Sequence, residues 1–181
     1  MSRPPRQASS SSIYHVMIRG VGQQALFLDS RDCERFLKYL KEVKETSPFI
    51  LYGYCLMKNH VHLLIRETVS PLAYFMKRIS LKYALYFNRK YQRIGHVFQD
   101  RYKSENVEDD RYFLTAYRYI LQNPVKAGIC ETPAQYRWSS YSEIFKSGSL
   151  VDSELPLAML GKEGLVEFVN MQTDEACMDV E

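Results

Sequence analysis

The feature that most constrains the fold is the order in which strand-like and helix-like patterns follow one another along the chain. Short runs rich in β-forming residues predict strands, and apolar residues that recur every three or four positions predict amphipathic helices. Gly20 and Gly22 favour a turn after the first strand, Ser47-Pro48 stops the first helix, and Pro124 is expected to end the last helix. The predicted elements are strands over 14–19, 50–57 and 60–66, extended chain over 96–99 and 102–107, and helices over 30–46, over 71–88 and from 110 through 121 up to Pro124.

The resulting order, β-α-β-β-α-β-α, is typical of a ferredoxin-like α+β fold. Only Lys58-Asn59 separates the second strand from the third, so the two are expected to form an antiparallel hairpin. We therefore expect an antiparallel sheet with helices packed on one face, and one additional helix after the last strand.

The length of 181 residues fits one domain of ordinary size. Residues 1–12, which contain a Pro pair and four consecutive serines, predict a flexible leader. Residues 13–146 form the predicted domain, and residues 147–181 form a C-terminal extension with only a weak helical pattern.

Charge is distributed unevenly along the chain. Residues 1–149 hold 23 Lys and Arg against 13 Asp and Glu, whereas residues 150–181 hold 1 against 8. A basic body attracts polyanions, which makes nucleic acid a reasonable partner. The acidic segment fits either a solubilising tail, which we favour, or an autoinhibitory mimic of DNA.

Membrane insertion and secretion are not indicated, because no apolar run approaches the roughly 20 residues that span a bilayer and the first 12 residues are polar. The four cysteines are scattered without a C-x-x-C pair, which argues against a disulfide framework or a zinc ribbon. We expect a cytoplasmic protein with reduced thiols.

The sequence His60-Val61-His62 falls on the predicted third strand. Side chains at positions i and i+2 of a strand project to the same face, so the two imidazoles would lie together as candidate metal ligands. Val61 would point the other way, into the core. Two surface or core histidines are an equally good explanation of this short pattern taken alone.

A third ligand is available on the last predicted helix. Tyr119 and Asn123 stand four residues apart and therefore share one helical face, where Asn123 can offer a carbonyl oxygen beside the Tyr119 phenol. Two imidazoles and one oxygen with open positions suit Mg²⁺ or Mn²⁺ holding a phosphate better than a structural zinc.

Five ordered blocks resemble the single-tyrosine HUH transposases, and among them the REP-associated tyrosine transposases and their insertion-sequence relatives. The resemblance covers about residues 13–145. The blocks are Tyr14-His15-Val16-Met17 with Arg19-Gly20, Leu56-Met57-Lys58-Asn59-His60-Val61-His62-Leu63-Leu64-Ile65, Tyr86-Phe87-Asn88, Gly95-His96-Val97-Phe98-Gln99 with Arg101-Tyr102-Lys103-Ser104, and Tyr119-Ile120 with Asn123-Pro124-Val125-Lys126-Ala127-Gly128.

The resemblance implies that His60 and His62 are the HUH histidines, Tyr119 the nucleophile and Asn123 the third ligand of a divalent metal. The implied reaction cleaves single-stranded or hairpin DNA and transfers the strand through a 5′-phosphotyrosine. Ile18 and Val21-Gly22 depart from the family pattern and put the recognised DNA, rather than the chemistry, in doubt. The resemblance leaves both a monomer and a homodimer open.

Several cations are candidate DNA contacts, although solvated surface charge explains them as well. Arg101 and Lys103 precede the tyrosine helix, and Lys82, Arg89, Lys90 and Arg93 accompany aromatic residues on or just after the long middle helix.

The rival tyrosines, Tyr112 and Tyr117, are poorly placed to share a metal with Asn123. His15 and His96 are taken as structural, because neither has a partner at ligand spacing.

Two other functions remain open at this point. The same fold could serve as a regulatory nucleic-acid-binding protein without strand transfer. Alternatively, a metal-activated water could be the nucleophile, with Tyr119 as a bystander.

Overall fold

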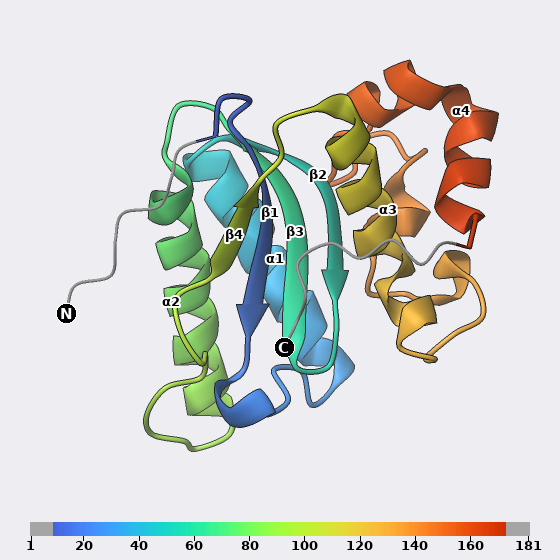
Figure 1. The fold of residues 1–181 in the computed structure, drawn as a ribbon. Coiled ribbons are helices and arrows are strands. Elements are labelled where there is room, and N and C mark those ends of the chain that lie inside the picture. The colour runs from blue at the N-terminus through green and yellow to red at the C-terminus, as the bar shows by residue number, and fades with distance from the viewer. Residues whose placement is uncertain (1–8, 173–181) are drawn as a thin grey trace.

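The computed structural model describes residues 9–172 and contains a four-stranded sheet with four α-helices (Figure 1). Three short 3-10 turns lie at Val21–Gln23, Pro133–Gln135 and Ser140–Glu143. The main elements are β1 (Ile13–Arg19), α1 (Ser30–Thr46), β2 (Phe49–Leu56), β3 (His60–Glu67), α2 (Leu72–Lys90), β4 (Lys103–Asn106), α3 (Asp110–Lys126) and α4 (Glu154–Asn170).

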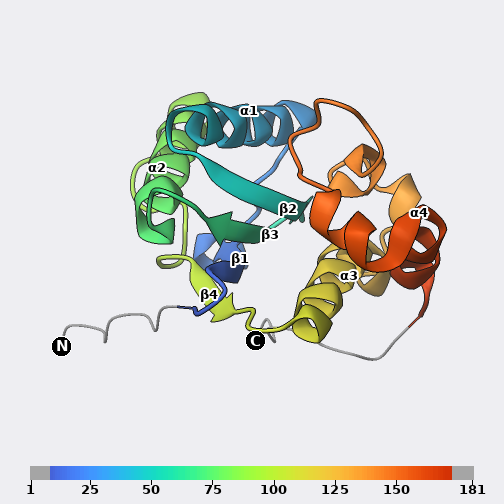
Figure 2. The same ribbon diagram turned by 90° about the horizontal axis from the view of Figure 1, so that it is seen from above.

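The strands are antiparallel and follow the order β2-β3-β1-β4 across the sheet. This order and the preceding β-α-β-β-α-β connectivity confirm the predicted ferredoxin-like α+β fold. Helices α1 and α2 lie side by side on one face, and α3 lies against the other face (Figure 2). The sheet thus separates two hydrophobic cores.

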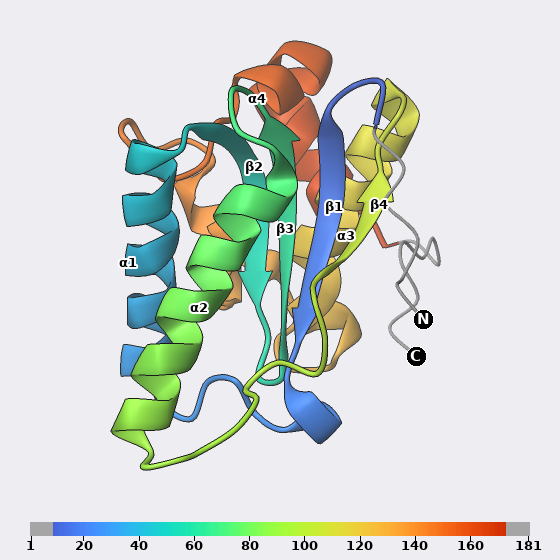
Figure 3. The same ribbon diagram turned by 90° about the vertical axis from the view of Figure 1, so that its left-hand side faces the viewer.

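Side chains of β1 and β3 point alternately to the two faces of the sheet and so contribute to both cores. Val16 and Ile18 of β1 and Val61 and Leu63 of β3 pack under α1 and α2, as the strand pattern predicts. The residues between them face α3, which crosses β2 and β3 on the other side (Figure 3). Each strand is therefore fixed by apolar packing on one side and free to present polar groups on the other.

The register of β1 against β3 decides which polar groups meet on the α3 face. Arg19 pairs with His60, Met17 with His62 and His15 with Leu64. Residues directly opposite one another project to the same face of the sheet. His15 and the two predicted HUH histidines consequently lie on a common surface.

The predicted leader only partly lies within the described residues. Of its twelve positions, residues 9–12 are described, and they are attached to the chain that follows β4. Ser11 donates a hydrogen bond to the carbonyl oxygen of Val107, Ser10 bonds the carboxylate of Glu108, and the backbone N–H of Ser9 donates to the hydroxyl of Tyr14. These residues belong to the packed domain, on the N-terminal side of the predicted boundary at residue 13.

Helix α3 runs through Pro124 instead of ending before it. A proline lacks the N–H that would bond to Ile120, but the backbone N–H of Ala127 still donates to the carbonyl of Asn123, and that of Ile129 to the carbonyl of Pro124. The prediction that Pro124 ends the helix is therefore wrong, since the loss of one bond near a helix end is tolerated.

The described part of the acidic extension is folded against α3. Leu165 and Val169 of α4 are buried in the core beneath α3 and α4. The side-chain amide of Gln122 donates to the carbonyl oxygens of Val169 and Met171, both at 2.7 Å. The extension thus covers the outer side of the tyrosine helix.

Among residues 9–172 no helix is both long enough and apolar enough to cross a membrane. Cys33, Cys55 and Cys130 are free thiols, and Cys177 lies outside the described residues.

Candidate active site

The two predicted HUH histidines lie together on β3. Their ring centroids are 4.9 Å apart, His62 is fully buried and His60 is half-buried. Burial lowers the pKa of His60 to about 4, although a side-chain hydrogen bond with Asn123 acts in the opposite direction. Burial, together with unfavourable electrostatic interactions between protonated His62 and His15, His60 and Arg19, also holds the pKa of His62 well below its ordinary range. Both imidazoles are therefore neutral at pH 7, which is the form that binds metals.

Helix α3 brings Tyr119 and Asn123 to these histidines. Asp109 caps the start of the helix by accepting a hydrogen bond from the backbone N–H of Tyr112 at 2.7 Å. The Tyr119 ring meets the His62 ring edge-on, with 5.6 Å between centroids. Asn123, one turn later, is 8% exposed and forms the side-chain hydrogen bond with His60. The four residues singled out in the sequence lie together in the structure.

The donor set fits a divalent metal with open coordination positions. The Nε2 atom of His62 is buried and has no hydrogen-bond partner among residues 9–172, so it is a lone donor atom with nothing else to bind. Within that range no three His, Cys, Asp or Glu side chains are grouped so that they could hold a metal ion. The candidate ligands are therefore the two imidazoles and the Asn123 amide. Such a mixed set suits Mg²⁺ or Mn²⁺ better than a closed zinc site.

His15 belongs to this site although its position in the sequence did not indicate it. Its Nε2 atom lies 2.9 Å from Nδ1 of His62, and its ring centroid lies 5.9 Å from that of Tyr119. Burial lowers the pKa of His15 to about 4. The only available signal was its place on a strand that pairs with β3, and the pairing register was not readable from the sequence.

Two cations also border the candidate site. The Nζ atom of Lys126 lies 5.2 Å from the centre of the Tyr119 ring. Arg19 is opposite His60 in the sheet, and its charge contributes to lowering the pKa of both His60 and His62. Positive charge therefore borders both the phenol and the histidines.

The predicted DNA contacts divide between the two faces of the sheet. Lys103 is exposed and pairs with Met17, which itself pairs with His62, so Lys103 projects to the face that carries the histidines. Arg101, just before β4, is exposed as well.

Lys82 and Lys90 lie on the opposite side of the sheet and bind acidic groups there. Lys82 pairs with Glu42 of α1 at 2.7 Å, and Lys90 pairs with Asp29 and Asp32 at 2.8 and 2.7 Å. Arg89 is exposed, and Arg93 stacks over the ring of Phe87.

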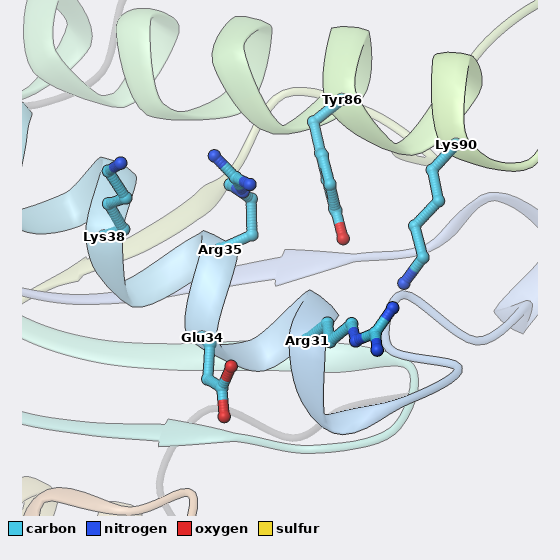
Figure 4. Close-up of a pocket in the computed structure, with 6 residues that line it drawn as sticks. All are labelled: Arg31, Glu34, Arg35, Lys38, Tyr86 and Lys90. Carbon is cyan, nitrogen blue, oxygen red and sulfur yellow. The ribbon is translucent and has the colours of Figure 1, made fainter.

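A hollow of about 590 Å³ lies between α1 and α2 on this side (Figure 4). It is lined by Arg31, Glu34, Arg35, Lys38, Tyr86 and Lys90. The sheet separates this basic hollow from Tyr119 and the histidines.

The rival tyrosines are engaged elsewhere. Tyr117 is fully buried and stacks on Phe113 beneath the sheet. The hydroxyl of Tyr112 donates to the carboxylate of Glu105 at 2.5 Å. Of the three tyrosines considered, Tyr119 is the one whose ring contacts the histidines.

Comparison with known proteins gives a consistent result. A sequence profile described as "Transposase IS200 like" matches residues 8–123, well over half of the chain, and ends at Asn123. A relative from Haemophilus influenzae, described as a "Putative REP-associated tyrosine transposase", is 27% identical in an alignment of 124 residues; the match covers 62% of this chain and 70% of the relative. The solved structure of a REP-associated tyrosine transposase bound to a REP hairpin matches with a TM-score of 0.70 at 14% identity, over 84% of this chain and 94% of that one, and so shares the fold. These findings confirm the family that the five sequence blocks predicted: the chain belongs to the IS200-like transposases.

Proposed function

We propose that this transposase cleaves and rejoins single-stranded or hairpin DNA through a covalent bond between Tyr119 and the DNA, in a reaction that depends on a divalent metal. The observation that carries the proposal is the meeting of α3 with β3: the Tyr119 ring lies against His62, and Asn123 is hydrogen-bonded to His60. A nucleophile and three candidate ligands thus come from two elements that pack directly on each other.

The proposed step is a transesterification. The phenolic oxygen of Tyr119 forms a bond to the scissile phosphorus, and the bond from phosphorus to the 3′ oxygen of the preceding nucleotide breaks. The phenol gives up one proton and the departing oxygen takes one up, which leaves a 5′-phosphotyrosine and a free 3′-hydroxyl. Because a phosphodiester is exchanged for a phosphodiester, attack by a 3′-hydroxyl on the phosphotyrosine reverses the step and rejoins a strand.

His60, His62 and Asn123 would hold the metal, which supplies Lewis acidity and neutralises charge at the scissile phosphate. Positively charged side chains of this chain have further roles near that metal site. The Lys126 ammonium over the Tyr119 ring stabilises the phenolate as the proton leaves. Lys103, on the face that carries the histidines, and the exposed Arg101 just before β4 contact the phosphates of the bound strand.

The proposed DNA partner is a hairpin or another single-stranded structure. The family supports DNA as the substrate, and a relative of the same fold was solved with a REP hairpin. All four residues of the candidate site come from one chain. We propose that one chain is sufficient for the chemistry; the sequence left a homodimer open.

The test uses hairpin oligonucleotides labelled at either the 5′ or the 3′ end, incubated with the protein and Mn²⁺ and resolved on a denaturing gel. A 5′-phosphotyrosine predicts that the 3′ label becomes attached to protein and the 5′ label does not. Tyr119→Phe abolishes both the adduct and cleavage, whereas Tyr112→Phe, on the same helix, retains them. His60→Ala or chelation removes activity with the fold intact.

Two results would contradict the proposal. Nearly normal cleavage by Tyr119→Phe would identify water as the nucleophile. Tight hairpin binding by the wild type with no cleavage of any tested strand would identify a regulatory binding protein.

A further inference from the structure

We infer that His15 is a positioning residue for the candidate metal ligand His62: its Nε2 atom accepts a hydrogen bond from Nδ1–H of His62 and so keeps Nε2 of His62 available for coordination. The inference deepens the proposed function and rests on it. It assigns a role to a β1 residue that lies outside the histidine pair and the tyrosine helix.

The contact is built into the sheet. His15 pairs with Leu64 and His62 pairs with Met17, so the two histidines are diagonal neighbours on the same face of β1 and β3. Their facing nitrogens are 2.9 Å apart, their ring centroids are 5.1 Å apart, and neither side chain is exposed. Solvent does not compete for this hydrogen bond.

The identity of residue 15 is unusual for its surroundings. The next residue of β1 on the same face, Met17, is apolar and buried, and the residue opposite His15 is Leu64. An apolar side chain at position 15 would fit this environment but would leave Nδ1 of His62 buried without a partner. The hydrogen bond to His62 therefore explains why position 15 is occupied by a histidine.

The single hydrogen bond couples the protons of the two rings. A neutral imidazole carries one proton, on either Nδ1 or Nε2. If His62 donates from Nδ1, its Nε2 holds a lone pair, and His15 carries its own proton on Nδ1. If His15 donates from Nε2 instead, His62 must carry its proton on Nε2 and has no lone pair there for a metal. Only the first arrangement is compatible with coordination through Nε2.

The outer nitrogens of the pair, Nε2 of His62 and Nδ1 of His15, are both buried, and neither has a hydrogen-bond partner in the described part of the chain. The inward nitrogens are thus committed to each other, and Nε2 of His62 is the ring atom left for a ligand. Hydrogen bonds of this kind to the second nitrogen of a ligating histidine orient the ring and raise its basicity.

The first measurement needs no metal. Long-range ¹H–¹⁵N correlation spectra of the ¹⁵N-labelled full chain report the tautomer of each histidine. We expect His62 and His15 both to carry their protons on Nδ1. A proton on Nε2 of His62 in the wild type would overturn the inference.

The second measurement compares Mn²⁺ affinity by isothermal titration calorimetry in three variants. His15→Leu cannot accept the hydrogen bond and should weaken Mn²⁺ binding about 10- to 100-fold. His15→Gln offers a side-chain oxygen near the same place and should recover most of the affinity. Met17→Leu, a matched change on the same strand and face, should leave the affinity unchanged.

The outcomes separate the inference from the proposed function. Equal Mn²⁺ affinity of folded His15→Leu and Met17→Leu, in a protein whose wild type forms the Tyr119 adduct, would overturn the role of His15 and leave the function standing. If His15→Leu does not fold, the tautomer of His62 in the wild type and the Mn²⁺ affinity of His15→Gln decide whether His15 positions His62. Mn²⁺ binding that depends on His15 without any adduct would contradict the function alone. Absence of Mn²⁺ binding by the wild type would overturn both.

Discussion

The aromatic ring of Tyr119 stands edge-on to the imidazole of His62, at 5.6 Å between centroids and an interplanar angle of 85°. One residue comes from the last helix of the family's matched region and the other from the middle of the sheet. Their contact places the proposed nucleophile beside a candidate metal ligand without any further movement of the backbone. The predictions below follow from this contact and from the charges and packing around it.

Lys126 is expected to accelerate cleavage through its position over the Tyr119 ring. A unit charge about 4 Å from a developing charge near a protein surface is worth about 1 to 4 kcal/mol. Lys126→Gln should therefore slow single-turnover cleavage about tenfold, equivalent to about 1.4 kcal/mol, whereas Lys126→Arg should slow it less.

The matched control for this experiment is Lys162→Gln. Lys162 makes the same type of contact, at 5.2 Å, with the ring of Phe145, which has no hydroxyl. If the Lys162 variant loses as much activity as the Lys126 variant, the effect does not come from the phenolate.

Lys103 is expected to contact DNA, and Lys82 is not. Lys103 lies on the face that carries His62, two strands away or about 10 Å across the sheet, while Lys82 is paired with Glu42 on the other face. Lys103→Ala should weaken hairpin binding and reduce the slope of log affinity against log salt by about 0.7 to 0.9. Fluorescence anisotropy at several salt concentrations measures both, and an equal effect of Lys82→Ala would show that the strand follows α1 and α2 instead.

The carboxylate of Asp32 should contribute to stability at neutral pH and lose that contribution in acid. Burial alone would raise its pKa, but hydrogen bonds from Lys90, Tyr91, the Leu28 backbone and Tyr86 outweigh burial and lower the pKa. A carboxyl whose pKa is lower in the folded state stabilises the fold above its unfolded pKa of about 3.9. The contribution disappears as the pH falls through the lower, folded value.

The test is urea unfolding of Asp32→Asn at pH 7 and near pH 3. The variant should lose about 3 kcal/mol at pH 7, because it removes the buried partner of a partly exposed ion pair with Lys90. The difference from the wild type should shrink at the lower pH. Glu34→Gln, which alters an exposed pair with Arg137, is the control and should cost less than about 1 kcal/mol at either pH.

Gln122 is expected to hold α4 on the tyrosine helix. Its amide donates to two carbonyl oxygens at the end of α4, and the side chain is 6% exposed. Gln122→Ala should destabilise the protein by about 1 to 3 kcal/mol and increase amide hydrogen exchange in α4. Asn170→Ala, which removes exposed hydrogen bonds near the same end, should change exchange much less. Unchanged exchange in the Gln122 variant would mean that apolar packing of Leu165 and Val169 alone holds the helix.

Most of the fold could be predicted because its helices and strands are encoded by patterns of residues that are close together in the sequence. Three such patterns depend only on neighbouring residues: the spacing of apolar residues in α2, the strands on either side of Lys58-Asn59, and the proximity of His60 to His62. The pairing of Tyr119 with Asn123 is likewise set by helical geometry. Such features need no knowledge of the tertiary structure.

The features that escaped prediction depend on contacts between distant residues. His15 and His62 are 47 positions apart and meet only through the register of β1 against β3. Lys90 could not be distinguished from an exposed cation in the sequence, because its partners Asp29 and Asp32 are 61 and 58 positions away. The weak helical pattern of α4 likewise gave no sign that Leu165 and Val169 would be buried against α3.

The helix that carries Tyr119 is fastened along two sides, by Ile120 and Tyr117 toward the sheet and by Gln122 toward α4. Packing on both sides opposes rotation of the helix about its long axis and movement of the helix away from the sheet. If Tyr119 is the nucleophile proposed above, we expect the phenol to stay in place and successive DNA ends to reach it by rearrangement of the nucleic acid. Under that proposal, the C-terminal helix, which lies beyond the residues that the family profile matches, favours movement of the DNA over movement of the helix during strand exchange.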